Sequence, residues 1–270
     1  MHPNLGAPRR VDHRALRPVF RAGDRGYAAC VAGLGWPRSL WFVRHGESRG
    51  NVANALARKA RALRLDIDVN DVHVELTDAG VEQAVALGRW MARQPSERLP
   101  TQVAVSPYLR ARETARLVLE NAGLDHLPLI VDERLRDREQ GVLDRLTGEG
   151  VRSEFPDEAT RRDYLGKFWY RPSGGESWAD VTMRMRAWLL ETRLTMPDER
   201  VLVVTHDVPI LLARYVIDGL TPDEVASYSN LLRNCSVTSY EQRPDGGLQL
   251  DAFNDTTALT TDDAPLTARG

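Results

Sequence analysis

The chain has 270 residues, of which 42% are hydrophobic and 27% charged, a composition typical of a globular protein with a sizeable core. Its 36 Lys and Arg against 38 Asp and Glu residues leave a formal net charge of −2, which argues against a general nucleic-acid binder. No apolar run reaches the length of about 20 residues that spans a bilayer, so we expect no membrane partner.

The two ends of the chain differ from its middle. Residues 1–38 are rich in arginine, carry several Gly and Pro, and show no sustained apolar period. They predict an N-terminal extension that is disordered or lies on the domain, with an Arg-rich targeting leader as the alternative. Residues 255–270 are rich in Thr and Asp and predict a flexible, solvated tail. A single domain is therefore expected over residues 39–254.

Within this domain, short apolar runs alternate with patterns of helical spacing. We expect strands at residues 40–43, 102–105, 129–131 and 201–204, and a hairpin of residues 235–241 and 248–253 around Pro244-Asp245-Gly246-Gly247. A polar loop follows the first strand, and helices are expected after Thr77, over residues 109–121, after Ser177, from Pro209 to Gly219, and after Thr221. This alternation predicts a three-layer α/β/α sandwich with a mostly parallel central sheet. Residues 145–172 break the alternation and predict a cap-like insertion over one end of the sheet.

Polar side chains follow each predicted parallel strand. Because the carboxyl ends of such strands meet at one rim, these side chains are expected to form a cationic pocket for a tetrahedral anion. Arginine binds phosphate oxygens in pairs, a neutral imidazole can attack phosphorus, and a carboxylic acid can protonate a leaving oxygen. The set comprises Arg44 and His45, then Arg110, then Asp137 and Glu139, and finally His206 and Asp207.

Two nearby motifs are interpreted as structural. Ser106 precedes a predicted helix and has no base beside it in the sequence, so we expect it to cap that helix. Gly174-Gly175-Glu176-Ser177 is interpreted as a turn and helix cap, not as a phosphate-binding loop.

Cysteine and histidine spacing bears on metals and on the compartment. The only cysteines are Cys30 and Cys235, far short of a disulfide framework, which suits a reducing cytoplasm. The six histidines form no i, i+4 pair and no set with cysteine at ligand spacing. We therefore expect a cytoplasmic protein with no metal site and no cofactor.

The stretch Leu40-Trp41-Phe42-Val43-Arg44-His45-Gly46-Glu47-Ser48, with Asn51 behind it, resembles the signature of the histidine phosphatase superfamily. Similar blocks follow in the family's order over residues 106–115, 133–141 and 203–206. The resemblance covers about residues 39–254 and implies a histidine phosphatase catalytic domain with the phosphoglycerate mutase-like fold. It also implies that His45 becomes a phosphohistidine and that the phosphoryl group is bound by Arg44, Arg110 and His206, assisted by Asn51.

The resemblance leaves the general acid open among three carboxylates. Asp137 falls where the mutase-like branch places its acid, usually a glutamate, and is favoured because the surrounding blocks are mutase-like. Asp207 directly follows His206, and a His-Asp pair supplies the proton donor in the acid-phosphatase and phytase branch. Glu139 is the third candidate.

We expect a phosphatase that hydrolyses a small phosphomonoester through a phosphohistidine, independently of metal. A mutase-type phosphoryl transferase is the nearest alternative, but residues 137–141 lack the Arg-His-Tyr-Gly run that mutases carry after their acid. A non-catalytic module that binds a phosphorylated ligand is a second alternative, against which the intact His45 and His206 argue. The sequence leaves the substrate and the oligomeric state open, a homodimer included.

Overall fold

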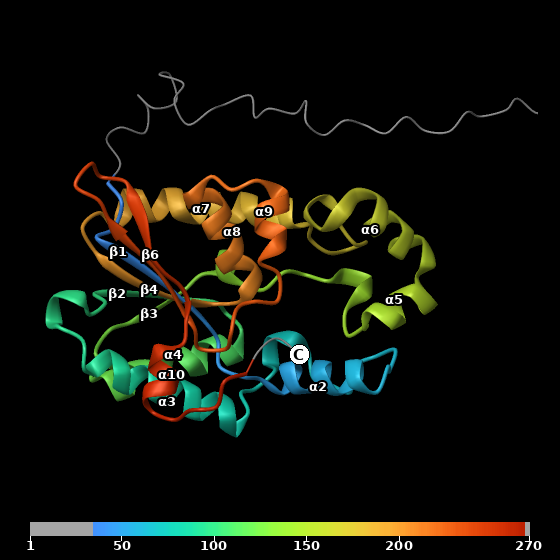
Figure 1. The fold of residues 1–270 in the computed structure, drawn as a ribbon, viewed down its shortest axis with the longest axis horizontal. Helices are drawn as coiled ribbons and strands as arrows, with labels where there is room; N and C mark the ends of the chain where they lie inside the picture. Colours follow the sequence, from blue (N-terminus) through green and yellow to red (C-terminus); the bar gives the residue numbers. More distant parts are fainter. Residues whose placement is uncertain (1–34, 268–270) are drawn as a thin grey trace, which may run out of the picture. The chain divides into compact units, whose positions relative to one another are not determined.

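A computed structural model describes residues 35–267, so all but the last four residues of the expected N-terminal extension lie outside the described part of the chain. Its centre is a six-stranded sheet with the strand order β3-β2-β4-β1-β5-β6 (Figure 1). Strands β1 (Ser39–Arg44), β2 (Gln102–Val105), β3 (Leu129–Val131) and β4 (Arg200–Thr205) are mutually parallel. Strands β5 (Val237–Gln242) and β6 (Leu248–Asp255) form the antiparallel hairpin. The predicted strands and the mostly parallel sheet are confirmed.

Helices cover both faces of the sheet, which confirms the three-layer sandwich (Figure 1). One layer holds α7 (Trp178–Thr195), α8 (Asp207–Asp218) and α9 (Pro222–Ser227), and the other holds α3 (Asp78–Ala92), α4 (Leu109–Ala122) and α10 (Thr257–Thr261). The predicted caps are in place, because the hydroxyls of Thr77, Ser177 and Thr221 each accept a backbone N–H of the following helix. No helix between residues 35 and 267 is long and apolar enough to cross a membrane.

The inner strands are apolar on both faces because each face packs against a helical layer. Along β1, Leu40 and Phe42 belong to the core beneath α7 and α8, whereas Trp41 and Val43 belong to the core beneath α3 and α4. All four are almost fully buried. A continuous apolar run is therefore what a central strand of this sheet requires.

The polar loop expected after β1 is instead the helix α2 (Arg49–Lys59). Ser48 and Asn51 form a capping box at its start, a signal that the sequence carries. Ala57 is its only buried residue, so the helix has no apolar period from which it could be predicted. The remaining connections of the described residues contain four single-turn 3-10 helices: η2 (Asp71–His73), η3 (Ser96–Arg98), η4 (Glu133–Leu135) and η5 (Gly141–Leu143).

The insertion over residues 145–172 contains α5 (Gly148–Glu154) and α6 (Pro156–Trp169). Figure 1 shows both helices beyond one end of the sheet rather than over a face. Leu143, Val151 and Tyr170 form a small apolar cluster there, separate from the two main cores.

The structure corrects the prediction of a flexible tail from residue 255 onward, because the chain packs against the domain as far as residue 267. Leu259 of α10 is fully buried in the core beside α3. Gln83 of α3 donates hydrogen bonds from Nε2 to the Pro265 carbonyl oxygen (2.8 Å) and to Thr267 Oγ1 (2.7 Å). Composition predicted solvation, but one buried leucine and two side-chain hydrogen bonds hold the segment in place.

Candidate active site

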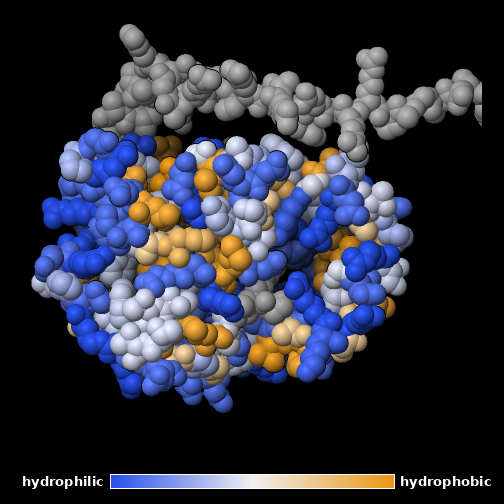
Figure 2. Space-filling model, viewed as in Figure 1, coloured by the Kyte–Doolittle hydropathy of each residue, from blue (hydrophilic) through white to orange (hydrophobic). Residues whose placement is uncertain are grey.

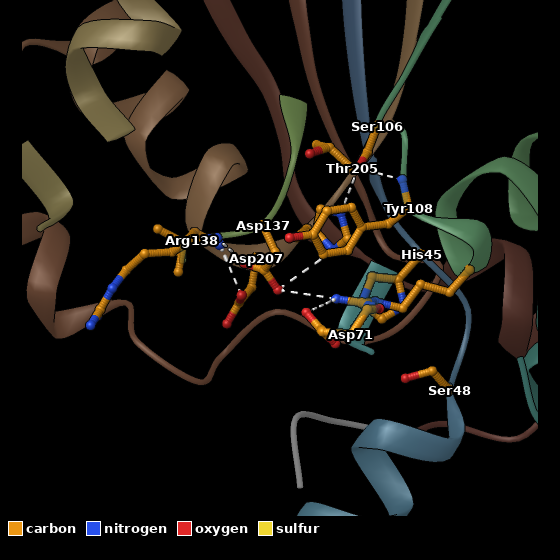
Figure 3. Close-up of polar contacts among 12 residues, drawn as sticks. His45, Ser48, Asp71, Ser106, Tyr108, Asp137, Arg138, Thr205 and Asp207 are labelled. Carbon is orange, nitrogen blue, oxygen red and sulfur yellow. Dashed lines mark hydrogen bonds and ion pairs between the residues drawn. The ribbon is translucent and has the colours of Figure 1, made fainter. Parts of the chain in front are cut away.

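The parallel pairing of β1 and β4 brings two histidines side by side. Arg44 pairs with Thr205 in the sheet, so His45 and His206 leave neighbouring strands at the same level. Their ring centroids are 5.1 Å apart, and both residues are buried. The predicted histidine pair is therefore assembled at the carboxyl rim of the sheet (Figure 3).

Backbone geometry fixes the tautomer of His45. Its Nδ1 lies 2.7 Å from the carbonyl oxygen of Gly46, which can only accept a hydrogen bond, so Nδ1 carries the proton. Nε2 is then the basic nitrogen, and Nε of Arg110 donates to it at 3.3 Å. Burial, followed by the charges of Arg110, His206 and Arg44, lowers the pKa of His45 well below its ordinary value. His45 is therefore a neutral imidazole with its Nε2 lone pair directed at Arg110.

Gly46 allows this arrangement by close packing. A Cβ at this position would lie 2.5 Å from the carbonyl oxygen of Gly80, so any side chain would push the start of α3 away. The Gly46 N–H donates to Thr114 Oγ1 at 3.0 Å, and that hydroxyl donates to the carbonyl oxygen of Arg110. Gly46 thus ties the His45 loop to the helix that carries Arg110.

Arg110 meets a carboxylate that the sequence did not single out. Its Nη1 donates to Asp71 Oδ1 at 3.0 Å and to the Asp71 carbonyl oxygen at 2.7 Å, and its Nη2 donates to Asp71 Oδ2 at 3.2 Å. Nη2 also lies 3.4 Å from Asp137 Oδ2. Burial raises the pKa of Asp71 against the lowering effect of Arg110, and the negative charge of Asp137 raises it further. Asp71 follows no strand, so no strand-end pattern could have found it.

Arg44 and Asn51 line the same pocket. Arg44 is almost fully buried, and its Nη1 donates to the Leu232 carbonyl oxygen at 2.6 Å. Asn51 Oδ1 accepts from the Ser48 N–H and from Asn234 Nδ2, so its oxygen serves the α2 cap. Only its Nδ2 donor suits the predicted contact with a phosphoryl oxygen.

Ser106 contacts His206 and does not cap α4 as expected, because the N-cap residue of that helix is Tyr108 and α4 has no side-chain cap. Ser106 Oγ lies 2.8 Å from His206 Nε2 and also accepts from the Tyr108 N–H, where α4 begins (Figure 3). His206 Nδ1 is buried, and within the described chain it makes no hydrogen bond, its neighbour Asp137 Oδ2 lying 3.6 Å away. Burial, followed by the charges of Arg110, Arg184 and Arg44, lowers the pKa of His206. The buried Nδ1 is thus the ring nitrogen of His206 that remains available for a hydrogen bond.

The three candidate acids lie in different surroundings. Asp137 approaches both Arg110 and His206, and its side chain is 26% exposed. Asp207 also lines the pocket, but its Oδ1 accepts the Val208 N–H at the start of α8. Glu139 accepts a hydrogen bond from the Tyr108 hydroxyl at 3.1 Å and is not among the pocket-lining residues of the described chain. The contacts therefore bring Asp137, more directly than the other two, to the reacting groups.

Comparison with known proteins agrees with this geometry. Residues 40–256 match the family model described as the histidine phosphatase superfamily (branch 1). The chain belongs to the histidine phosphatase superfamily. The expected family and fold are confirmed, and the protein is an enzyme of this superfamily.

Named relatives of this histidine phosphatase fall into two groups. A 2,3-bisphosphoglycerate-dependent phosphoglycerate mutase of Methylobacterium radiotolerans is 33% identical over 194 residues, 70% of this chain and 82% of the mutase. A mutase of the same description from Gloeobacter violaceus is 29% identical over 77% of this chain and 87% of its own length. The structure of a mycobacterial glucosyl-3-phosphoglycerate phosphatase with VO3 is 26% identical, with a TM-score of 0.64, and covers 81% of this chain and 100% of that one. Mutases and phosphatases are thus both among its relatives.

The loop that carries Asp137 is held by a network that the sequence analysis missed. Arg184 of α7 donates to the carbonyl oxygens of Arg134 and Asp137, the latter at 3.1 Å. Glu176 accepts from Arg184 Nε at 3.0 Å and from the Glu139 N–H at 3.1 Å. Glu176 belongs to the motif interpreted as a turn and cap, so that motif also positions the loop that carries Asp137.

The site opens into a pocket of about 340 Å³ that reaches the α5–α6 insertion. Figure 2 shows the surface hollowed beside the lobe that these helices form. Apolar side chains from the segment after α2 and from the insertion line one part, and Arg58, Arg162 and Lys167 line another. Between residues 35 and 267, no group of three or more His, Cys, Asp or Glu side chains is arranged to hold a metal ion.

Proposed function

We propose that this enzyme is a phosphomonoester hydrolase that works through a phosphohistidine at His45 and needs no metal ion. The observation that carries the proposal is the state of His45, a buried neutral imidazole whose Nε2 faces Arg110. Such a nitrogen is a competent nucleophile toward phosphorus, and the neighbouring positive charges stabilise the phosphoryl group under attack.

In the first step, Nε2 of His45 attacks phosphorus and the ester P–O bond breaks. Arg44, Arg110 and the Nδ1–H of His206 bind the phosphoryl oxygens. The leaving oxygen takes its proton from the carboxyl group of Asp137, which lies 3.6 Å from His206 and 3.4 Å from Arg110. The products of this step are the alcohol, the phosphohistidine and the Asp137 carboxylate.

In the second step, a water molecule attacks phosphorus and the P–N bond breaks. The Asp137 carboxylate takes a proton from that water, so the carboxyl group and the neutral His45 are restored and phosphate leaves. Exposure of about a quarter of the Asp137 side chain gives water a route to this position. A mutase has to protect its phosphohistidine from water, whereas a hydrolase has to admit it.

The test is hydrolysis of p-nitrophenyl phosphate by the wild type and by His45→Ala, with excess EDTA, between pH 4.5 and 8. We expect turnover by the wild type and its loss in the variant, together with a covalent phosphoenzyme in acid-quenched wild type alone. Loss of wild-type activity in EDTA with recovery in Mg²⁺ contradicts the metal-independent mechanism.

The mutase relatives make phosphoryl transfer the second candidate function. Interconversion of 2- and 3-phosphoglycerate in the presence of 2,3-bisphosphoglycerate, faster than release of phosphate, is the result that would favour it. Phosphate binding without turnover in either assay would favour the non-catalytic binding module.

A further inference from the structure

Every N–H group of Arg110 already has an acceptor within the described protein. The guanidinium carries five N–H groups. Nε donates to His45 Nε2, Nη1 donates twice to Asp71, and Nη2 donates once to Asp71 and once to Asp137. A phosphoryl oxygen can therefore bind Arg110 only by replacing one of these acceptors.

The three acceptor residues differ in how firmly they are held. His45 is buried and fixed through Nδ1 by the Gly46 carbonyl oxygen, and Asp137 accepts the Arg138 N–H at 2.7 Å. The Asp71 side chain is 47% exposed and sits on a single-turn 3-10 helix. Among the described residues, only Arg110 donates side-chain hydrogen bonds to the Asp71 carboxylate. Asp71 is thus the acceptor that can leave with the least disturbance.

The Asp71 carboxylate also matches a phosphoryl group in chemistry. Its two oxygens receive one N–H from each Nη atom, which is the paired geometry that arginine uses for phosphate oxygens. Arg110 is 5% exposed, and a buried guanidinium without a counter-anion is costly. Asp71 therefore supplies the negative charge that Arg110 needs while no substrate is bound.

We propose that Asp71 is a built-in competitor for the phosphoryl group, occupying Arg110 in the empty site and leaving it when a phosphoryl group binds. This inference rests on the proposed function, in which Arg110 binds the phosphoryl group. Competition of this kind weakens the binding of substrate and of product phosphate, while it keeps Arg110 in its binding position. Asp71 therefore sets the affinity of Arg110 for phosphoryl groups, and it takes no part in proton transfer.

The experiment compares the wild type with Asp71→Asn, which keeps the shape of the side chain and removes its charge. We expect Asp71→Asn to bind inorganic phosphate and orthovanadate about fivefold more tightly, as measured by inhibition and by calorimetry, because a partly exposed ion pair contributes modestly. KM for p-nitrophenyl phosphate is expected to fall by a similar factor, with a smaller change in kcat. Asp68→Asn, which removes one charge from an exposed position of the same segment, is expected to leave all these values unchanged.

Several results would overturn the inference. Weaker phosphate binding in Asp71→Asn, with an unchanged thermal unfolding midpoint, would show that Asp71 positions Arg110 instead of competing with its ligand. Asp71→Ser repeats the measurement should the first variant fold poorly. A structure of the wild type with orthovanadate in which both Asp71 oxygens remain on Arg110 would also exclude competition. Failure of the proposed function has a different signature, namely no wild-type turnover of p-nitrophenyl phosphate, whatever Asp71→Asn does to phosphate binding.

Discussion

The hydrogen bond between Nδ1 of His45 and the Gly46 carbonyl oxygen determines which ring nitrogen can react. His206 is oriented by a different device, the hydroxyl of Ser106, and both rings are kept neutral by burial among arginines. Two imidazoles of the same residue type thus have different surroundings, one with a basic nitrogen beside Arg110 and one with a buried Nδ1 that has no hydrogen-bond partner within the described residues. The hydrogen-bond partner of each imidazole therefore determines the chemistry of the site as much as the residue type does.

The lowered pKa of His45 makes a prediction about pH. Because the pKa of His45 is lowered, its Nε2 becomes protonated only at a pH below the ordinary histidine pKa near 6.5. The nucleophile therefore stays active through pH 6. We expect the burst of p-nitrophenol at saturating substrate to keep its rate between pH 8 and 6 and to fall only at more acidic pH. Arg44→Met removes one of the charges that lower the pKa, so its acidic limb is expected to move upward. A wild-type limb centred at the ordinary histidine pKa would contradict this account.

The contacts of Asp137 predict that it is the general acid. A leaving group of high pKa needs the proton, whereas p-nitrophenolate leaves without it. We therefore expect Asp137→Asn to lower kcat about 100-fold or more for an alkyl phosphate and much less for p-nitrophenyl phosphate. Glu139→Gln, whose carboxylate accepts from the Tyr108 hydroxyl, is the matched control and is expected to show no such dependence on the leaving group. The same pattern in Asp207→Asn instead would transfer the role to Asp207.

At the scale of elements, apolar periodicity predicted the strands and helices that form the sheet and its two covering layers. It missed the helices that do not pack on the sheet. The central strands and the helices of both layers have buried, periodic apolar residues, and their caps are visible in the sequence. Helix α2 has one buried residue, and α10 docks through tertiary contacts, so neither has a local period. The carboxyl ends of the predicted strands likewise indicated His45, Arg110 and His206 as candidate site residues. The roles of Asp71 and Glu176 depend on segments that meet only in the folded chain.

The network behind the acid loop predicts a positioning effect. Glu176 and Arg184 contact no reacting group, but Arg184 holds two carbonyl oxygens of the loop that carries Asp137. Arg184→Met is expected to lower kcat about 10-fold for an alkyl phosphate, with little change for p-nitrophenyl phosphate and in KM. Arg186→Met, two residues further along the same helix, is the control. Equal losses for both substrates would indicate a general loss of structure instead.

The docked C-terminal segment predicts a contribution to stability. Leu259 is fully buried, so Leu259→Ala removes buried apolar surface and leaves a cavity, with an expected loss of about 2–4 kcal/mol in the free energy of unfolding. Leu266→Ala, at a position that is 50% exposed, is expected to cost less than about 0.5 kcal/mol. Denaturant unfolding followed by circular dichroism measures both. A negligible effect of Leu259→Ala would mean that the segment does not stay docked.

At the scale of the whole molecule, the charge of the pocket differs from the charge of the chain. The formal net charge is −2, but the pocket in the described part is lined by seven Arg and Lys side chains against four Asp. Four of these cations, Arg58, Arg145, Arg162 and Lys167, come from α2 and from the insertion, beyond the residues that surround His45. The fold thus concentrates positive charge in this pocket.

This distribution predicts that the pocket attracts anionic substrates from a distance and that salt weakens the attraction. We expect kcat/KM for a dianionic phosphomonoester to fall as ionic strength rises from about 0.01 to 0.15 M, because the screening length shortens from about 30 to 8 Å. Arg162→Gln is expected to raise KM about two- to threefold with little change in kcat and to reduce the salt dependence. Arg152→Gln, which removes the same charge from α5 at a position that does not line the pocket, is the control. Equal effects of the two substitutions would mean that overall charge, rather than its placement in the pocket, governs substrate capture.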